Sequence, residues 1–281
     1  MTPVALIWDY DGAIGQVNSS YPYNFHEESL LREIENVESI LNIGRSHDIS
    51  MTFAITGFTA ESGAYPYHFP EQIRSIYSHG HEVASHSWRH EWFPFLQEEQ
   101  IRRSLARSKK VLEACIGVEG AVRGFVPPFS RPMSWYAKGA VSLGDRVLGP
   151  WYRGASLGTL LNYVAGAGYT WCRVAFRPLW RKVFGDRRQV KREAFQEKGL
   201  WCIPQHCTGF GERALELLES HITTRRALFI VAHPLGLTLP HDENLLKFKR
   251  FVDVLGRYRD EQRVRTVTVS QYLHGLNCER C

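Results

Sequence analysis

The chain has 281 residues, of which 44% are hydrophobic and 22% are charged. These proportions exclude large-scale disorder, and the length is sufficient for one sizeable buried core, so we expect a single domain over residues 1–281. The net charge of +5 suits an anionic ligand or a membrane surface, but it is too small to indicate nucleic acid, and no nucleic-acid-binding motif is present.

The amino terminus reads MTPVALIWDYDG and lacks the charged start, long apolar run and cleavage site of a secretory signal. No stretch of the sequence approaches the roughly 20 apolar residues that a membrane span requires. If residue 1 is native, these features predict a cytoplasmic protein, either soluble or peripheral to the inner face of the membrane.

Strand-like and helix-like patterns alternate along the chain. In its first half, strands are predicted at 4–8, 49–55, 82–85 and 122–126, and helices at 27–46, 70–77 and 97–115. In its second half, strands are predicted at 146–148, 200–204, 228–232 and 264–269, and helices at 156–165, 211–220, 243–258 and from 270 onward. Residues 15–25 are interpreted as a polar aromatic loop. Such alternation predicts a parallel sheet with helices outside, either open or closed into a barrel.

Polar side chains and a proline pair follow four of the predicted strands, at the point where each strand ends. They are Asp9 and Asp11, His86 and His90, Pro127 and Pro128 with Phe129, and His233. In barrels of alternating strands and helices, the chemistry lies where strands end and loops begin. We therefore expect one face of the molecule to gather these groups.

The gathered groups have the composition of a catalytic metal site. Two imidazoles and one carboxylate suit zinc, cobalt, nickel or iron, and three protein ligands leave room for water and substrate. His86 and His90 are four residues apart, which places both rings on one face if they lie on a helical turn. A second carboxylate two residues from the ligand aspartate can act as a base on the bound water, and a histidine from another strand can protonate a leaving nitrogen.

Four segments in this order resemble the NodB-homology polysaccharide deacetylases. A strand ends in WDYDG at 8–12, HSWRH follows at 86–90 after HGHEVAS, and FVPPFS stands at 125–130. The apolar strand FIVAHP at 229–234 corresponds to the family's last motif. The likeness extends from residue 4 to about residue 275, and the HSWRH segment in its context is its most specific part.

The resemblance implies a distorted (β/α) barrel of about seven parallel strands. It implies that Asp11, His86 and His90 hold a divalent metal, with zinc the first choice and cobalt, nickel or iron as alternatives. It also implies that Asp9 is the base that activates water and that His233 is the acid for the amine. The main-chain amide of Phe129, next to Pro128, is expected to help bind the oxyanion.

Two family features are absent from their usual places. The arginine of the third motif, which orients the catalytic aspartate in the family, is Val126 here, and Arg123 or Arg131 is the expected replacement. The fourth motif has no clear match, and Trp171 with Arg173 is the nearest candidate. Both departures concern groups that support the site rather than the metal ligands themselves.

Aromatic and basic segments bear on the substrate. Trp88 is expected to line the mouth of the site together with Tyr65, Tyr67 and Trp92, since aromatic rings suit the faces of sugars. Residues 173–192 are basic with interleaved aromatics. This stretch is interpreted either as a solvated segment or as a contact for an anionic sugar or a lipid surface.

These observations lead to three functional hypotheses. The first is hydrolytic N-deacetylation of an N-acetylated or N-acylated sugar, dependent on a metal, in biosynthesis of a surface polysaccharide or another glycan. The second is an amidase acting on a cyclic amide or ureide, and the third is a metal- and sugar-binding protein without turnover. An arginine beside Asp9 would favour either enzyme, whereas a blocked pocket would favour the binding protein. The sequence does not determine the oligomeric state.

Overall fold

The computed structural model describes residues 1–19, 27–93, 96–130, 157–174, 193–238 and 244–278. The strands are β1 Thr2–Tyr10, β2 Thr52–Ile55, β3 Glu82–Ser85, β4 Gly124–Phe125, β5 Trp171–Arg173, β6 Phe195–Glu197, β7 Leu200–Ile203, β8 Cys207–Thr208, β9 Leu228–Ala232 and β10 Val264–Thr266. The α-helices are α1 Gly12–Ser19, α2 Glu27–Ser46, α3 Pro70–Ser78, α4 Glu98–Ile116, α5 Leu157–Gly166, α7 Glu212–Thr224, α8 Leu245–Asp260 and α9 Val269–Cys278. Short 3-10 helices are η1 Gly57–Ala60, η3 Pro128–Ser130 and η5 Pro234–Thr238.

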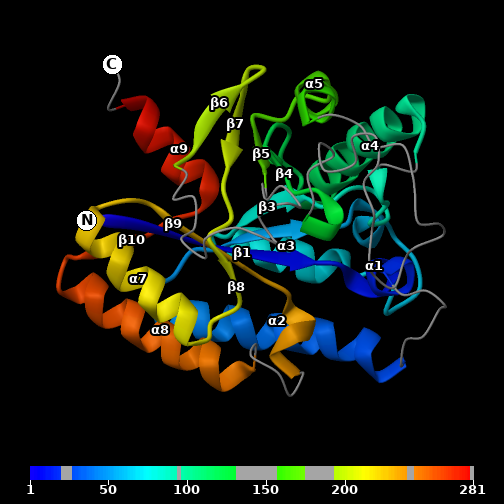
Figure 1. Ribbon diagram of the computed structural model, residues 1–281. Coiled ribbons are helices and arrows are strands. Elements are labelled where there is room, and N and C mark those ends of the chain that lie inside the picture. Colours follow the sequence, from blue (N-terminus) through cyan, green and yellow to red (C-terminus); the bar gives the residue numbers. More distant parts are fainter. Residues whose placement is uncertain (20–26, 94–95, 131–156, 175–192, 239–243, 279–281) are drawn as a thin grey trace, which may run out of the picture.

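The strands form one curled sheet in the order β6-β7-β5-β4-β3-β2-β1-β9-β8, with β10 beside β1 (Figure 1). Among the described pairings, only β6 with β7 is antiparallel. The predicted α/β fold is confirmed, and the sheet is a half-barrel in which β1 pairs with three strands, β2, β9 and β10. Because the other strands run parallel, their carboxyl ends meet at one edge, which we call the carboxyl end of the sheet.

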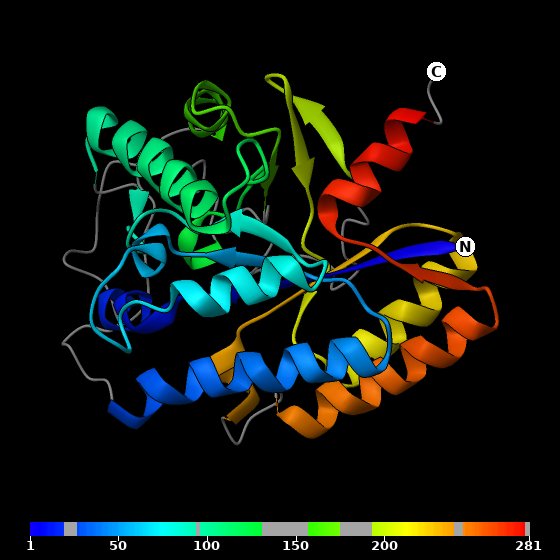
Figure 2. The same cartoon turned by 180° about the vertical axis from the view of Figure 1, so that it is seen from behind.

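The two faces of the sheet pack against different elements. On β1, Trp8 and Tyr10 point outward into the core beneath the helices, while Ala5 and Ile7 belong to a second cluster on the inner face. Figures 1 and 2 show α2, α7 and α8 side by side along one flank of the sheet. With the period of two in a strand, Asp9 shares the inner face with Ala5 and Ile7.

Helix α9 closes the opposite end of the inner face, which we call the amino end of the sheet. Its Tyr272 and Leu273 belong to the inner cluster. The first amides of α9 are bound by residues that begin two strands: Val269 N donates to Thr52 Oγ1 at 3.1 Å, and Ser270 N donates to Glu82 Oε2 at 3.0 Å. These contacts satisfy helix-end donors that otherwise lack partners.

Most elements lie close to their predicted positions, and three have the predicted bounds: α2 at 27–46, β3 at 82–85 and β9 at 228–232. The loop interpretation of 15–25 is wrong for its first part, because Gly12–Ser19 is helical. This segment contains two glycines and no apolar stripe, so its propensity does not favour a helix, and contacts with α2 stabilise it instead. The strand expected at 146–148 lies outside the described residues.

Candidate metal centre and catalytic site

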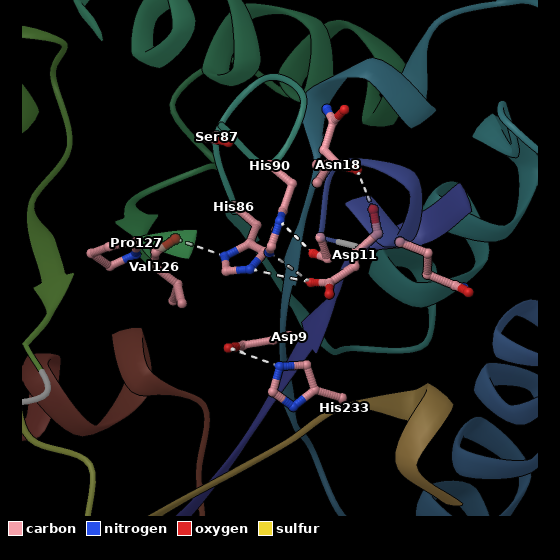
Figure 3. Close-up of polar contacts among 12 residues, drawn as sticks. Asp9, Asp11, Asn18, His86, Ser87, His90, Val126, Pro127 and His233 are labelled. Carbon is pink, nitrogen blue, oxygen red and sulfur yellow. Dashed lines mark hydrogen bonds and ion pairs between the residues drawn. The ribbon is translucent and has the colours of Figure 1, made fainter. Parts of the chain in front are cut away.

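Three potential metal ligands meet at the carboxyl end of the sheet. Asp11 follows β1, and the turn after β3 carries His86 and His90. Asp11 Oδ1 lies 3.3 Å from Nε2 of His86 and 3.3 Å from Nε2 of His90. One ligand atom from each residue falls within 4.8 Å of the other two, and Figure 3 shows both rings facing the Asp11 carboxylate.

The turn that carries the histidines is irregular. Ser87 has φ of 67° and His90 has φ of 59°, both in the left-handed region, so the expected helical turn is wrong although the rings still converge. Glu91 ties the turn together, because its Oε2 accepts from Ser87 Oγ at 2.7 Å and from Arg89 N at 2.8 Å. Left-handed backbone at residues other than glycine is costly and is concentrated at functional sites.

The unsatisfied atoms of this cluster fit a divalent metal. Asp11 Oδ1 and His86 Nε2 are buried without a hydrogen-bond partner. The other nitrogens of the two rings are engaged: His86 Nδ1 donates to the carbonyl of Val126 at 2.7 Å, and His90 Nδ1 lies 3.0 Å from Ser19 Oγ. A proton on each Nδ1 leaves each Nε2 lone pair facing Asp11, and this donor set of two nitrogens and one oxygen suits zinc or a similar ion.

Two acidic groups at this corner have displaced pKa values. Burial by itself raises the pKa of Asp11, but the imidazoles of His90, His86 and His233 outweigh burial and lower it below its usual value. Glu33 on α2 lies behind Asp11, and burial, followed by the charge of Asp11, raises its pKa to about 8. Gln16 on α1 donates to the Glu33 carboxyl group at 2.7 Å.

The second carboxylate of β1 has a different environment. Asp9 is 1% exposed, and both of its oxygens lie 2.9 Å from Nη1 of Arg173, which ends β5 and is also 1% exposed. His233 follows β9, and its Nε2 lies 3.8 Å from Asp9 Oδ2. The His233 side chain is 38% exposed, so it can meet an incoming substrate while its inner edge faces the carboxylate.

Arg173 occupies the role that the sequence assigned to Arg123 or Arg131. Arg123 is exposed, and its main-chain carbonyl accepts from the amide of Thr170 where β4 meets β5. Arg131 lies outside the described residues. The assignment of Arg173 to a basic contact surface is also wrong, because this side chain is buried against Asp9. The rest of that stretch, 175–192, lies outside the described residues.

The aromatic residues around the site do not behave alike. Phe129 has φ of 67°, and its ring packs against His90 and Trp92, with centroids 4.5 Å and 5.9 Å apart. Trp88 is only 5% exposed and packs beneath the guanidinium of Arg107, which lies 3.9 Å above its ring. The prediction that Trp88 lines the mouth is therefore wrong.

Two other predictions concern the margin of the site. Pro128 is buried beside Phe129, and the expected oxyanion contact of the Phe129 amide stays a prediction. Tyr65 is 59% exposed, and Tyr67 is partly buried.

Comparison with known proteins shows which proteins this chain resembles. Residues 31–147 match the family model for polysaccharide deacetylases. The chain is 24% identical over 160 residues to a peptidoglycan-N-acetylglucosamine deacetylase of Bacillus cereus, in an alignment covering 53% of this chain and 55% of that protein. The chain thus spans about half the length of that curated relative.

Solved structures show the same fold. A Mycobacterium smegmatis protein assigned to the polysaccharide deacetylases superposes with a TM-score of 0.67 at 18% identity, covering 99% of this chain and 91% of that one. An allantoinase superposes with a TM-score of 0.62 at 13% identity, covering 96% and 88% of the two chains. At these identities the likeness concerns the fold. The family-model match and the curated relative show that the chain is similar to polysaccharide deacetylases.

Proposed function

We propose that the chain is a metal-dependent hydrolase that removes an acyl group, acetyl in the first place, from the nitrogen of a sugar. The observation that carries this proposal is the pair of carboxylates two residues apart at the end of β1. Asp11 faces two imidazoles whose Nε2 atoms lie 3.3 Å away, whereas Asp9 is held by Arg173 and lies 3.8 Å from His233. Different surroundings for two neighbouring carboxylates support different roles, one as ligand and one as base.

Asp11, His86 and His90 would hold the metal, which when bound polarises the acyl oxygen and lowers the pKa of a coordinated water. Asp9 accepts the proton of the attacking water, and Arg173 fixes the direction of its carboxylate. The C–N bond then breaks as His233 delivers a proton from Nε2 to the leaving nitrogen. The products are a carboxylic acid and a free amine: one water proton goes to Asp9, and the other stays on the oxygen that enters the acid. Return of a proton from Asp9 to His233, whose Nε2 lies 3.8 Å from Asp9 Oδ2, restores both residues.

Several features support an enzyme rather than a binding protein. The arginine that the family places beside its catalytic aspartate is supplied here by Arg173, so the substitution at Val126 does not remove that contact. The family and the name of the Bacillus cereus relative favour an N-acetylated sugar as substrate. Within this proposal, zinc is the expected metal, and synthesis of a surface glycan is the expected context.

The test is a substrate screen with the full chain, stripped of metal and reloaded with zinc or cobalt. N-acetylglucosamine oligomers, N-acetylated nucleotide sugars and cyclic ureides are incubated in parallel, and products are identified by mass spectrometry. We expect equal amounts of amine and acetate from at least one sugar, and none with Asp9→Asn. Turnover of a ureide alone would support the amidase hypothesis. Binding of metal and sugar without any turnover would support the binding protein.

A further inference from the structure

The two histidines of the metal site are held in different ways, and the difference concerns helix α1. His86 Nδ1 is bound by a main-chain carbonyl, that of Val126. His90 Nδ1 instead meets a side chain, the hydroxyl of Ser19 at the end of α1, at 3.0 Å. A main-chain partner is present whatever the side chain is, whereas the Ser19 contact depends on one residue outside the family motifs.

Helix α1 packs directly against two ligands. Gly15 N donates to the carbonyl of Asp11 at 3.2 Å. A Cβ atom added at Gly15 would lie 2.6 Å from Cβ of Asp11 and 3.4 Å from Cβ of His90. The first distance is too short for any side chain, so glycine is required there for α1 to approach the ligands this closely.

Further contacts fix the helix along its length. Gln16 ties it to α2, because its Nε2 donates to Glu33 at 2.7 Å and to the carbonyl of Ser29 at 3.2 Å. Asn18 ties it to the histidine turn, donating from Nδ2 to the carbonyl of Arg89 at 2.6 Å. The Ser19 hydroxyl is therefore presented to His90 from a helix whose position is set on both sides.

We propose that Ser19 is a positioning residue for the metal ligand His90, an inference that rests on the proposed metal-dependent function. The Ser19 hydroxyl oxygen accepts a hydrogen bond from the Nδ1–H group of His90, and this fixes the tautomer and the plane of the ring so that the Nε2 lone pair faces Asp11. Groups that orient a ligand histidine in this way commonly contribute about 10- to 100-fold to metal affinity.

The test compares metal affinity in four full-length proteins: wild type, Ser19→Ala, Ser19→Thr and Ser39→Ala. Ser39→Ala is the matched control, because it deletes a hydroxyl on the neighbouring helix α2 that bonds only locally, to the carbonyl of Glu35. Each protein is stripped with a chelator and titrated with cobalt in competition with a chromophoric chelator. The visible absorption of bound cobalt reports the ligand field.

We expect Ser19→Ala to weaken cobalt binding by about 10- to 100-fold and to change the cobalt spectrum. Ser19→Thr keeps a hydroxyl and should recover most of the affinity, and Ser39→Ala should match wild type. Wild-type affinity in Ser19→Ala would overturn the inference, as would a Ser19→Thr protein as weak as Ser19→Ala. If wild type itself binds no cobalt, the proposed metal-dependent function fails together with the inference. If wild type binds cobalt and Ser19→Ala binds it equally well, only the inference fails.

Discussion

Glu82 and Asp11 are carboxylates at opposite ends of the inner face of the curled sheet, and they differ in their hydrogen-bond partners. Glu82 at the amino end accepts from Thr52 Oγ1 at 2.9 Å, from Trp171 Nε1 at 3.1 Å, and from both the amide and the hydroxyl of Ser270. Asp11 at the carboxyl end has an oxygen, Oδ1, that is buried without a hydrogen-bond partner.

One strand contributes to both ends. Trp171 and Arg173 are alternate residues of β5 and so point to the same face. The indole of Trp171 reaches down to Glu82 by lying across Gly124 of β4, where an added Cβ would stand 1.9 Å from the ring. The guanidinium of Arg173 reaches the other way, to Asp9.

The contrast separates a structural polar group from a functional one. A buried carboxylate whose acceptors are all used, as in Glu82, contributes to folding, because each missing partner would leave a donor without water. A carboxylate oxygen left without a donor and faced by two imidazole nitrogens is instead costly to folding by itself. A bound cation would stabilise this oxygen, which is why the cluster of Asp11, His86 and His90 indicates a metal site.

The largest effect is expected from His86→Ala, which removes one of three ligands. Stoichiometric zinc or cobalt binding should be lost, and activity should fall to background. In wild type, metal should raise the midpoint of thermal unfolding, because it binds only the folded state. The variant should show the midpoint of metal-free wild type, with or without added metal. Metal bound in equal amount by wild type and variant would remove His86 from the site.

The next effect concerns Asp9, which shares β1 with the ligand Asp11 but contacts Arg173 instead. Asp9→Asn should lower kcat by about 100- to 10,000-fold, the range for a general base. Metal content should be unchanged, since the ligand set is intact. Metal analysis and kinetics on the same preparation provide the measurement. Equal activity at equal metal content would exclude Asp9 as the base.

At the other end of the sheet, Glu82→Ala should act on stability alone. It removes the acceptor that Glu82 offers to the indole of Trp171, to the amide and hydroxyl of Ser270 and to the hydroxyl of Thr52, at a cost of about 2 to 4 kcal/mol. Denaturant unfolding measures this loss, and Glu82→Gln, which keeps one acceptor, should lose less. Metal affinity should match wild type. A Glu82→Ala protein that lost metal affinity but kept wild-type stability would contradict the assignment of a structural role to Glu82.

The smallest effect is a pH dependence at His81, just before β3. Burial, followed by the charges of His79 and Arg45, lowers the pKa of His81 from 6.5 to about 4. Its Nδ1 accepts from the amide of Met51 at 3.1 Å, a contact that only the neutral ring can make. The unfolded chain therefore binds a proton more readily than the folded one, and stability is lost as the pH falls from 6.5 towards 4.

This contribution amounts to about 2 kcal/mol across the window. It is measured as the difference in unfolding free energy between wild type and His81→Gln at each pH, both without metal. The ligand histidines titrate in both proteins and so cancel. A difference that stays constant with pH would show that His81 does not titrate in this way.

The alternation of apolar runs and polar breaks was enough to predict the α/β fold. A helix that buries one face and a strand that buries one or both faces each produce a characteristic spacing of hydrophobic residues in the sequence. It gave β3, β9 and α2 with the bounds that the structure has. The strand-end positions of Asp11, His86 and His90 also predicted that the three would meet, since parallel strands bring their ends to one edge whatever the helices do.

Other features were decided only by the tertiary structure. Asp9 and Arg173 are 164 residues apart in the sequence. Their pairing requires the Arg173 side chain to point to the inner face of the sheet, and a strand of three residues is too short for its hydrophobic period to reveal this. The sequence accordingly favoured Arg123 and Arg131, which are nearer to the family's position. Helix α1 likewise has no apolar stripe. It forms because Gln16 meets Glu33 and because Gly15 leaves room for Asp11, and such long-range contacts have no counterpart in local propensity.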